Sequence, residues 1–106
     1  MNKTIGALVM WAGLSAAVGA GEIPEHSFKP EGGYVPDAKT AIAIAVAVWG
    51  PIYGDDKIAA EQPYHARLNG NVWVVEGSLP EGWRGGVAVA EIAKDDGRVL
   101  RVSHGK

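Results

Sequence analysis

The residues that could carry acid–base chemistry in this chain are few and widely spaced. Glu76 and Glu91 each interrupt an apolar stretch, so each could face a cavity in which a carboxyl group acts as an acid or a base. His104 follows Leu100 and Val102 on an alternating segment and could lie at the rim of the same buried side. These three residues form a candidate pocket. In the alternative interpretation, both glutamates face solvent and His104 is a hydrogen-bonded histidine at a sheet edge.

The chain contains no recognisable nucleophilic or metal-binding set. Ser78 lacks the Gly-x-Ser-x-Gly turn, and Ser103 and His104 are strand neighbours whose side chains point to opposite faces. His26, His65 and His104 lack the spacing of metal ligands, and the chain has no cysteine. We therefore expect a protein that is not an enzyme, with no catalytic residues, no metal and no other cofactor.

The segment from Leu79 to Gly86 is the candidate for contact with another protein. Four of its eight residues are Gly or Pro, and Trp83 stands beside Arg84. Trp and Arg dominate the binding energy of many interfaces, and loops on a rigid scaffold often carry function. We predict Glu81, Trp83 and Arg84 as partner-binding residues. In the alternative, Trp83 folds back to close the open end of a small core.

A helix is predicted from Ala38 to Trp49, with Asp37 as its N-cap and Gly50-Pro51 as its end. The alternation of branched residues with alanine from Ile42 to Val48 would also suit a strand, but alanine favours helix. Because the apolar residues of this helix are spread around most of its circumference, we expect the helix to be largely buried against a curved sheet.

Four strands are predicted after a polar turn at Asp55 to Lys57, and Asn69-Gly70 and Asp95 to Gly97 form turns between them. Together the elements predict an α+β fold in which one Ala-rich helix packs on a small antiparallel β-meander, either NTF2-like or cystatin-like. The predicted strands span residues 64–68, 72–77, 87–93 and 99–104.

The first twenty residues have the three parts of a cleavable signal peptide: Lys3, an apolar run from Ile5 to Val18, and the small residues that end at Ala20. We expect cleavage after Ala20, an extended lead-in over residues 21–33, and one domain over residues 34–106. The mature protein would then be periplasmic or secreted, with no membrane attachment.

The composition argues against nucleic acid as a partner. The net charge is −2, and the basic residues are scattered along the chain instead of forming a stripe. A signal for export together with an acidic balance favours a soluble protein that meets other proteins outside the cytoplasm.

Several segments of the chain carry a family resemblance. They are Val35-Pro36 with the Ala-rich helix, Trp49 to Gly54, Val72 to Pro80, Gly85 to Val87, and Gly97 to Lys106. Together they resemble the NTF2-fold immunity proteins of bacterial polymorphic toxin systems. The resemblance implies that the protein binds a cognate protein toxin and neutralises it, without catalysis or a cofactor. The alternatives are a small NTF2-like enzyme or ligand carrier, and a housekeeping envelope protein.

Overall fold

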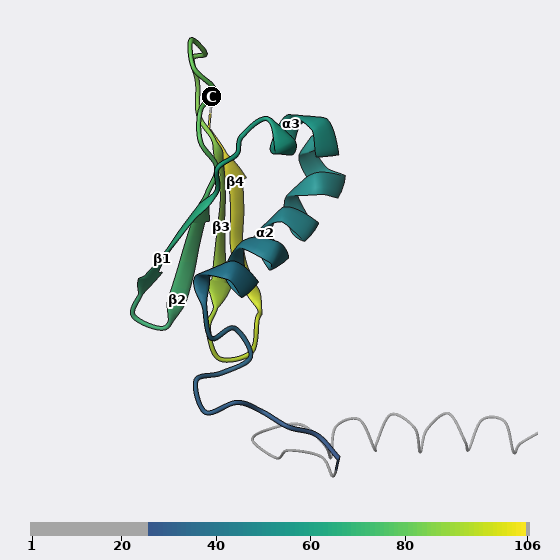
Figure 1. Ribbon diagram of the computed structural model, residues 1–106, viewed down its shortest axis with the longest axis vertical. Coiled ribbons are helices and arrows are strands. Elements are labelled where there is room, and N and C mark those ends of the chain that lie inside the picture. Colours follow the sequence, from purple (N-terminus) through teal and green to yellow (C-terminus); the bar gives the residue numbers. More distant parts are fainter. Residues whose placement is uncertain (1–25, 106) are drawn as a thin grey trace, which may run out of the picture.

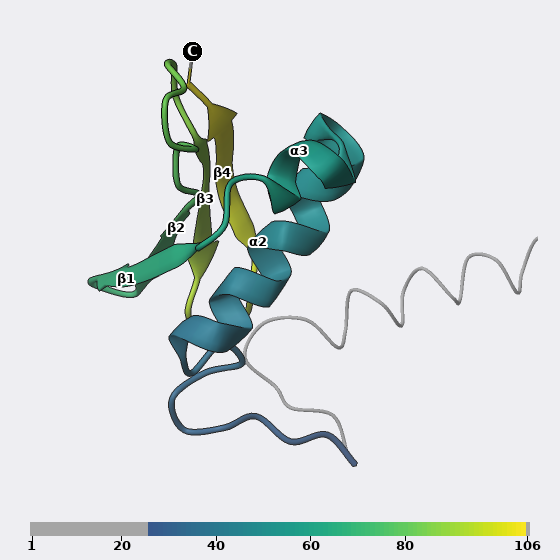
Figure 2. The ribbon, with the colours of Figure 1, turned by 45° about the horizontal axis from the view of Figure 1, so that its top comes forward.

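Two helices and a four-stranded antiparallel sheet make up the computed structural model, which describes residues 26–105 (Figure 1). The strands lie in the order β1-β2-β3-β4, and both helices lie on the same side of the sheet (Figure 2). This arrangement confirms the α+β prediction. The predicted signal peptide and the first five residues of the lead-in lie outside the described residues. The elements are α2 (Ala38–Tyr53), α3 (Asp55–Ala59), β1 (His65–Asn69), β2 (Val72–Glu76), β3 (Ala88–Ala93) and β4 (Val99–His104).

Helix α2 begins where the sequence predicts. The Asp37 side chain accepts hydrogen bonds from the Thr40 backbone N–H at 2.9 Å and from the Thr40 hydroxyl at 2.6 Å. These two bonds hold the pKa of Asp37 below its usual value, because they favour the charged carboxylate. The segment is helical, so the strand alternative for residues 42–48 does not apply.

The predicted end of α2 at Gly50-Pro51 is wrong, because the helix continues through Pro51 to Tyr53. A proline in a helix removes one backbone hydrogen bond and crowds the preceding turn. Here it lies in the last turn, next to the fully buried Trp49. The Gly54 N–H donates to the Gly50 carbonyl at 2.8 Å and closes the helix. A short helix, α3, then replaces the polar turn that was expected at Asp55 to Lys57.

One face of α2 packs on the sheet and the opposite face meets solvent. Ala41, Ala45 and Trp49 are fully buried at intervals of four residues, whereas Ala43 and Ala47 are exposed. The apolar composition of the helix predicted that it would be largely buried, and this prediction is wrong. Alanine tolerates both environments, so its abundance did not reveal which side of the helix would be covered.

The interior between α2 and the sheet is filled by large side chains. Trp49 donates its indole N–H to the Val89 carbonyl at 3.3 Å, and Trp73 donates to the Val35 carbonyl at 2.8 Å. The second bond fixes the segment before α2 against the sheet. The largest fully buried side chains are those of Trp49, Ile58, Ile92, Val35 and Val75.

The strands match the predicted ones to within one residue at each end. Gly70 completes the β1–β2 turn with φ +63°, a conformation that favours glycine. α3, the β2–β3 loop and the end of β4 gather at one end of the sheet (Figures 1 and 2). Within residues 26–105, no helix has the length and apolar character required to cross a bilayer.

Candidate functional site

The centre of the site is Glu61, a buried carboxylate that follows α3 and is 4% exposed. Its Oε1 accepts a hydrogen bond from the Ala88 backbone N–H at 2.8 Å, and its Oε2 lies 2.7 Å from Nε2 of His104. Ala88 and His104 are themselves partners in the β3–β4 register. One carboxylate therefore binds two neighbouring strands at once.

The His104 ring is enclosed on several sides. Its Nδ1 lies 2.8 Å from the Gly105 carbonyl oxygen, and the Tyr53 ring lies 5.1 Å away between centroids at a tilt of 57°. Each ring nitrogen therefore faces an oxygen atom. An imidazole that carries a proton on both nitrogens donates to both oxygens, and in that form it makes an ion pair with Glu61.

Gly77 and Ser78 hold Glu61 from the strand side. The Ser78 N–H donates to the Glu61 carbonyl at 2.6 Å. A Cβ atom at Gly77 would lie 2.5 Å from Glu61 Oε1, closer than atoms can approach without movement. The absence of a side chain at Gly77 thus makes room for the carboxylate. Ser78 itself is occupied, since its hydroxyl donates to the Pro63 carbonyl at 2.6 Å.

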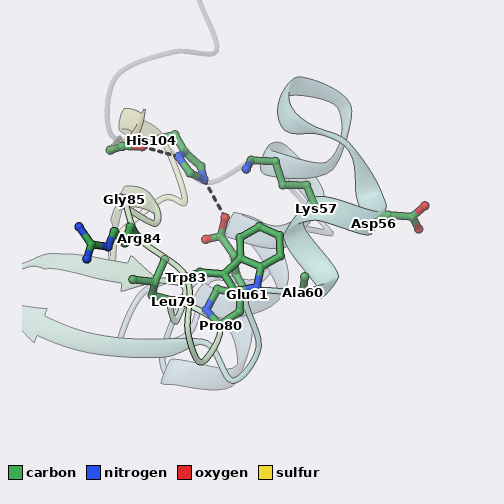
Figure 3. Close-up of a pocket in the computed structure, with 12 residues that line it drawn as sticks. Asp56, Lys57, Ala60, Glu61, Leu79, Pro80, Trp83, Arg84, Gly85 and His104 are labelled. Atoms are coloured by element: carbon green, nitrogen blue, oxygen red, sulfur yellow. Dashed lines mark hydrogen bonds and ion pairs between the residues drawn. The ribbon is translucent and has the colours of Figure 1, made fainter.

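A half-open cavity of about 550 Å³ lies beside this pair, between α3 and the β2–β3 loop (Figure 3). Apolar groups from Ala60, Leu79, Pro80 and Trp83 form much of its wall. The full lining consists of Asp56, Lys57, Ala60, Glu61, Leu79, Pro80, Trp83, Arg84, Gly85, Gly86, His104 and Gly105.

The cavity lining carries two cations, Lys57 and Arg84, and two carboxylates, Asp56 and Glu61, beside His104. In Figure 3 the amine end of Lys57 is directed to the side of the cavity where His104 lies, while the Asp56 carboxylate points away from it. Arg84 lies on the opposite wall. Among residues 26–105, neither Lys57 nor Arg84 has an ion-pair partner, while Glu61 is paired with His104. The two cations therefore lack an ion-pair partner in the described part of the chain, while Glu61 is already hydrogen-bonded and Asp56 is turned away.

Two of the three predicted loop residues lie at this cavity. Trp83 and Arg84 line it, and Trp83 is 65% exposed, so its ring is not folded into the core. Glu81 is exposed on the same loop but does not line the cavity. Of the three residues predicted for a pocket, the structure places only His104 here.

Glu76 and Glu91 lie on the sheet, away from the cavity lining. Glu91 forms an ion pair with Arg101 at 3.2 Å and alternates with the buried Ala90 and Ile92, so it lies on the face opposite the core. Glu76 ends β2, where it is paired in register with His65. Glu91 therefore follows the alternative interpretation, in which it faces solvent. The acidic residue beside His104 is instead Glu61.

Glu61 was missed because nothing in its local sequence marks it. It stands in a polar segment between α3 and β1, and its partner His104 is 43 residues away. A buried carboxylate can be recognised only when the strands that supply its donors are known. Within the described part of the chain, no group of three or more His, Asp or Glu residues could hold a metal ion.

The comparison with known proteins places this arrangement in a family. Residues 40–106 match the family described as NTF2 fold immunity protein. The chain belongs to this family. The match includes nearly all of α2, all of α3 and the sheet, and every residue that lines the cavity.

A curated relative of this immunity-family chain is the uncharacterized protein YhhH of Escherichia coli strain K12. The two are 44% identical over 55 residues, which cover 51% of this chain and 43% of YhhH. The chain thus spans less than half the length of that relative. No solved structure matches the chain.

Proposed function

We propose that this protein is an exported immunity protein that binds a cognate protein toxin and blocks its activity. One observation carries the proposal: the residues that match the immunity family include all those that line the cavity and its loop. Family membership alone does not fix an activity, so the surface must also suit a protein partner.

The surface around the cavity has the properties of a protein-binding site. Trp83 is exposed beside Arg84, and an exposed Trp next to Arg is a combination enriched among residues that dominate binding energy. The core beneath α2 is filled, and the cavity lies at the surface, where a partner protein can reach it. We assign Trp83 and Arg84, with Glu81 beside them, as the main toxin contacts.

The proposal includes export, because residues 1–20 have the composition of a signal peptide. Cleavage after Ala20 would release the domain into the periplasm or the medium. The protein would then meet a toxin outside the cytoplasm, and no catalytic step is required of it.

Co-expression with the toxin encoded by a neighbouring gene tests this function. Wild-type protein should restore growth and should be recovered with the toxin from a periplasmic extract. Trp83→Ala and Arg84→Ala should weaken both effects, whereas Arg67→Ala, a change of an exposed arginine on β1, should weaken neither. Failure of the wild-type protein to bind any such toxin or to protect cells would refute the proposal.

A further inference from the structure

We infer that the cavity between α3 and the β2–β3 loop receives an acidic side chain, Asp or Glu, from a segment of the partner protein. The inference deepens the proposed function and rests on it for the identity of the partner as a toxin. The chemistry of the occupant is argued from the cavity itself.

The first step is the local charge. The chain as a whole is acidic, with a net charge of −2, yet the cavity presents Lys57 and Arg84 without an ion-pair partner among residues 26–105. The lining also holds two carboxylates, Asp56 and Glu61, so the two cations are matched in number. Glu61 is bound by His104 and the Ala88 N–H, and the Asp56 carboxylate points away (Figure 3). Lys57 is then a cation on the cavity wall without an ion-pair partner among the described residues, and such a group favours an anionic ligand.

The second step is the position of each cation. Lys57 projects from α3 with its amine end on the His104 side of the cavity, whereas the Arg84 guanidinium is directed outward at the rim (Figure 3). Lys57 is therefore the residue that pairs with the incoming carboxylate. Arg84 attracts the acidic segment to the opening, where solvent weakens any single contact.

The third step is the apolar wall. Leu79, Pro80 and Trp83 line one side, and Leu79 and Trp83 are 41% and 65% exposed. A free inorganic anion would leave these groups in water. A peptide segment covers them with its own side chains while its carboxylate reaches Lys57, so the wall and the cation together favour an acidic protein segment.

Nuclear magnetic resonance titration of the full chain with short capped peptides tests the inference without requiring the toxin. The probes are a leucine-flanked glutamate peptide and its glutamine and lysine analogues. The glutamate peptide should shift the signals of Lys57 and of the Trp83 indole, with a dissociation constant about two- to fivefold below that of the glutamine peptide. The lysine peptide should bind more weakly than both.

Variants then locate the preference. Lys57→Gln should remove the glutamate-over-glutamine difference, and Lys39→Gln, an exposed lysine at the start of α2, should leave it unchanged. Equal binding of the glutamate and glutamine peptides, or shifts confined to another surface, would overturn the inference. Equal binding of free glutarate would also overturn it, since the occupant would then be a small acid.

The outcomes for the two proposals are separable. If the glutamate preference is found but no toxin is bound or neutralised, the function fails and the acidic recognition stands. If a toxin is neutralised with equal affinity by the wild-type and Lys57→Gln proteins, the function stands and the acidic recognition fails.

Discussion

The Glu61 carboxylate and the His104 imidazole meet at 2.7 Å although 43 residues separate them in the chain. Glu61 belongs to the link between α3 and β1, and His104 ends the last strand. Their contact joins the helical layer to the far edge of the sheet, since β4 is the strand furthest from β1. Both side chains also line the cavity, so the same pair fixes the distance between its walls.

Replacing Glu61 should destabilise the fold strongly. Glu61→Ala removes the acceptor of the Ala88 N–H and the partner of His104, and a buried group that loses its hydrogen-bond partner costs about 1–3 kcal/mol. Urea unfolding measures the loss. Glu91→Ala is the matched control, because its pair with Arg101 is solvent-exposed and contributes about 0–1 kcal/mol. Equal losses in both variants would contradict a structural role for the buried pair.

A methyl group at Gly77 should disturb the same site from the strand side. Gly77→Ala would place Cβ 2.5 Å from Glu61 Oε1, and crowding of this kind costs about 1–3 kcal/mol. At Gly32 the nearest atom to an added Cβ is the flexible Lys94 Nζ at 3.2 Å, so Gly32→Ala should cost much less. Thermal unfolding of the two variants compares them, and a silent Gly77→Ala would mean that Glu61 is free to move.

Tyr64 should make stability depend on alkaline pH. Burial, followed by the nearby Glu61 charge, raises the pKa of Tyr64 because both disfavour the phenolate. The folded state therefore holds the phenolic proton more tightly than the unfolded state. This contribution is fully present below pH about 10 and is lost as pH rises through the raised folded-state pKa.

Tyr64→Phe isolates that effect. The variant loses the hydrogen bond to the Ile58 carbonyl at 2.8 Å, a cost of about 0.5–1.5 kcal/mol at neutral pH. Its unfolding free energy should also decline less between pH 9 and 11 than that of the wild type. Tyr34→Phe, on a 44% exposed ring, serves as the control and should keep the wild-type decline.

Mass spectrometry of the protein recovered from the periplasm or the medium checks the proposed export. The product should begin at Gly21, because the small residues that end at Ala20 suit the signal peptidase. A change at the cleavage position, Ala20→Arg, should cause the longer precursor to accumulate. Recovery of the wild-type protein with residues 1–20 still attached would count against a freely exported domain.

Local signals were sufficient to predict most of the fold. Asp37 marked the start of α2, and the hairpin turn at Gly70 fixed the β1–β2 pair, because in each case the interacting groups lie within a few residues. The same local logic misjudged Pro51: the helix continues to Tyr53 although proline cannot donate to the carbonyl four residues earlier, and the fully buried Trp49 packs the adjacent turn. The alternation of residues in the third predicted strand was also compatible with Glu91 on either the core face or the solvent face of the sheet.

The candidate site was only partly predictable for a different reason. Trp83 and Arg84 are conspicuous by residue type, so the loop could be selected without knowledge of the fold. Lys57 belongs to the predicted polar turn at Asp55 to Lys57, and no prediction was made for Glu61. The importance of both residues comes from what lies opposite them. The strand order and the direction of α3 bring these residues face to face. The sequence near each residue carries no signal for either.

The Glu61–His104 contact also makes the cavity depend on a completely assembled sheet. A chain in which β4 has not yet paired with β3 has no His104 beside Glu61, and one wall of the cavity is missing. The contact bridges 43 residues, so it forms only when the α3–β1 link and the β3–β4 pair are docked on each other. A copy in which this contact is open should therefore lack the complete cavity and bind its partner poorly.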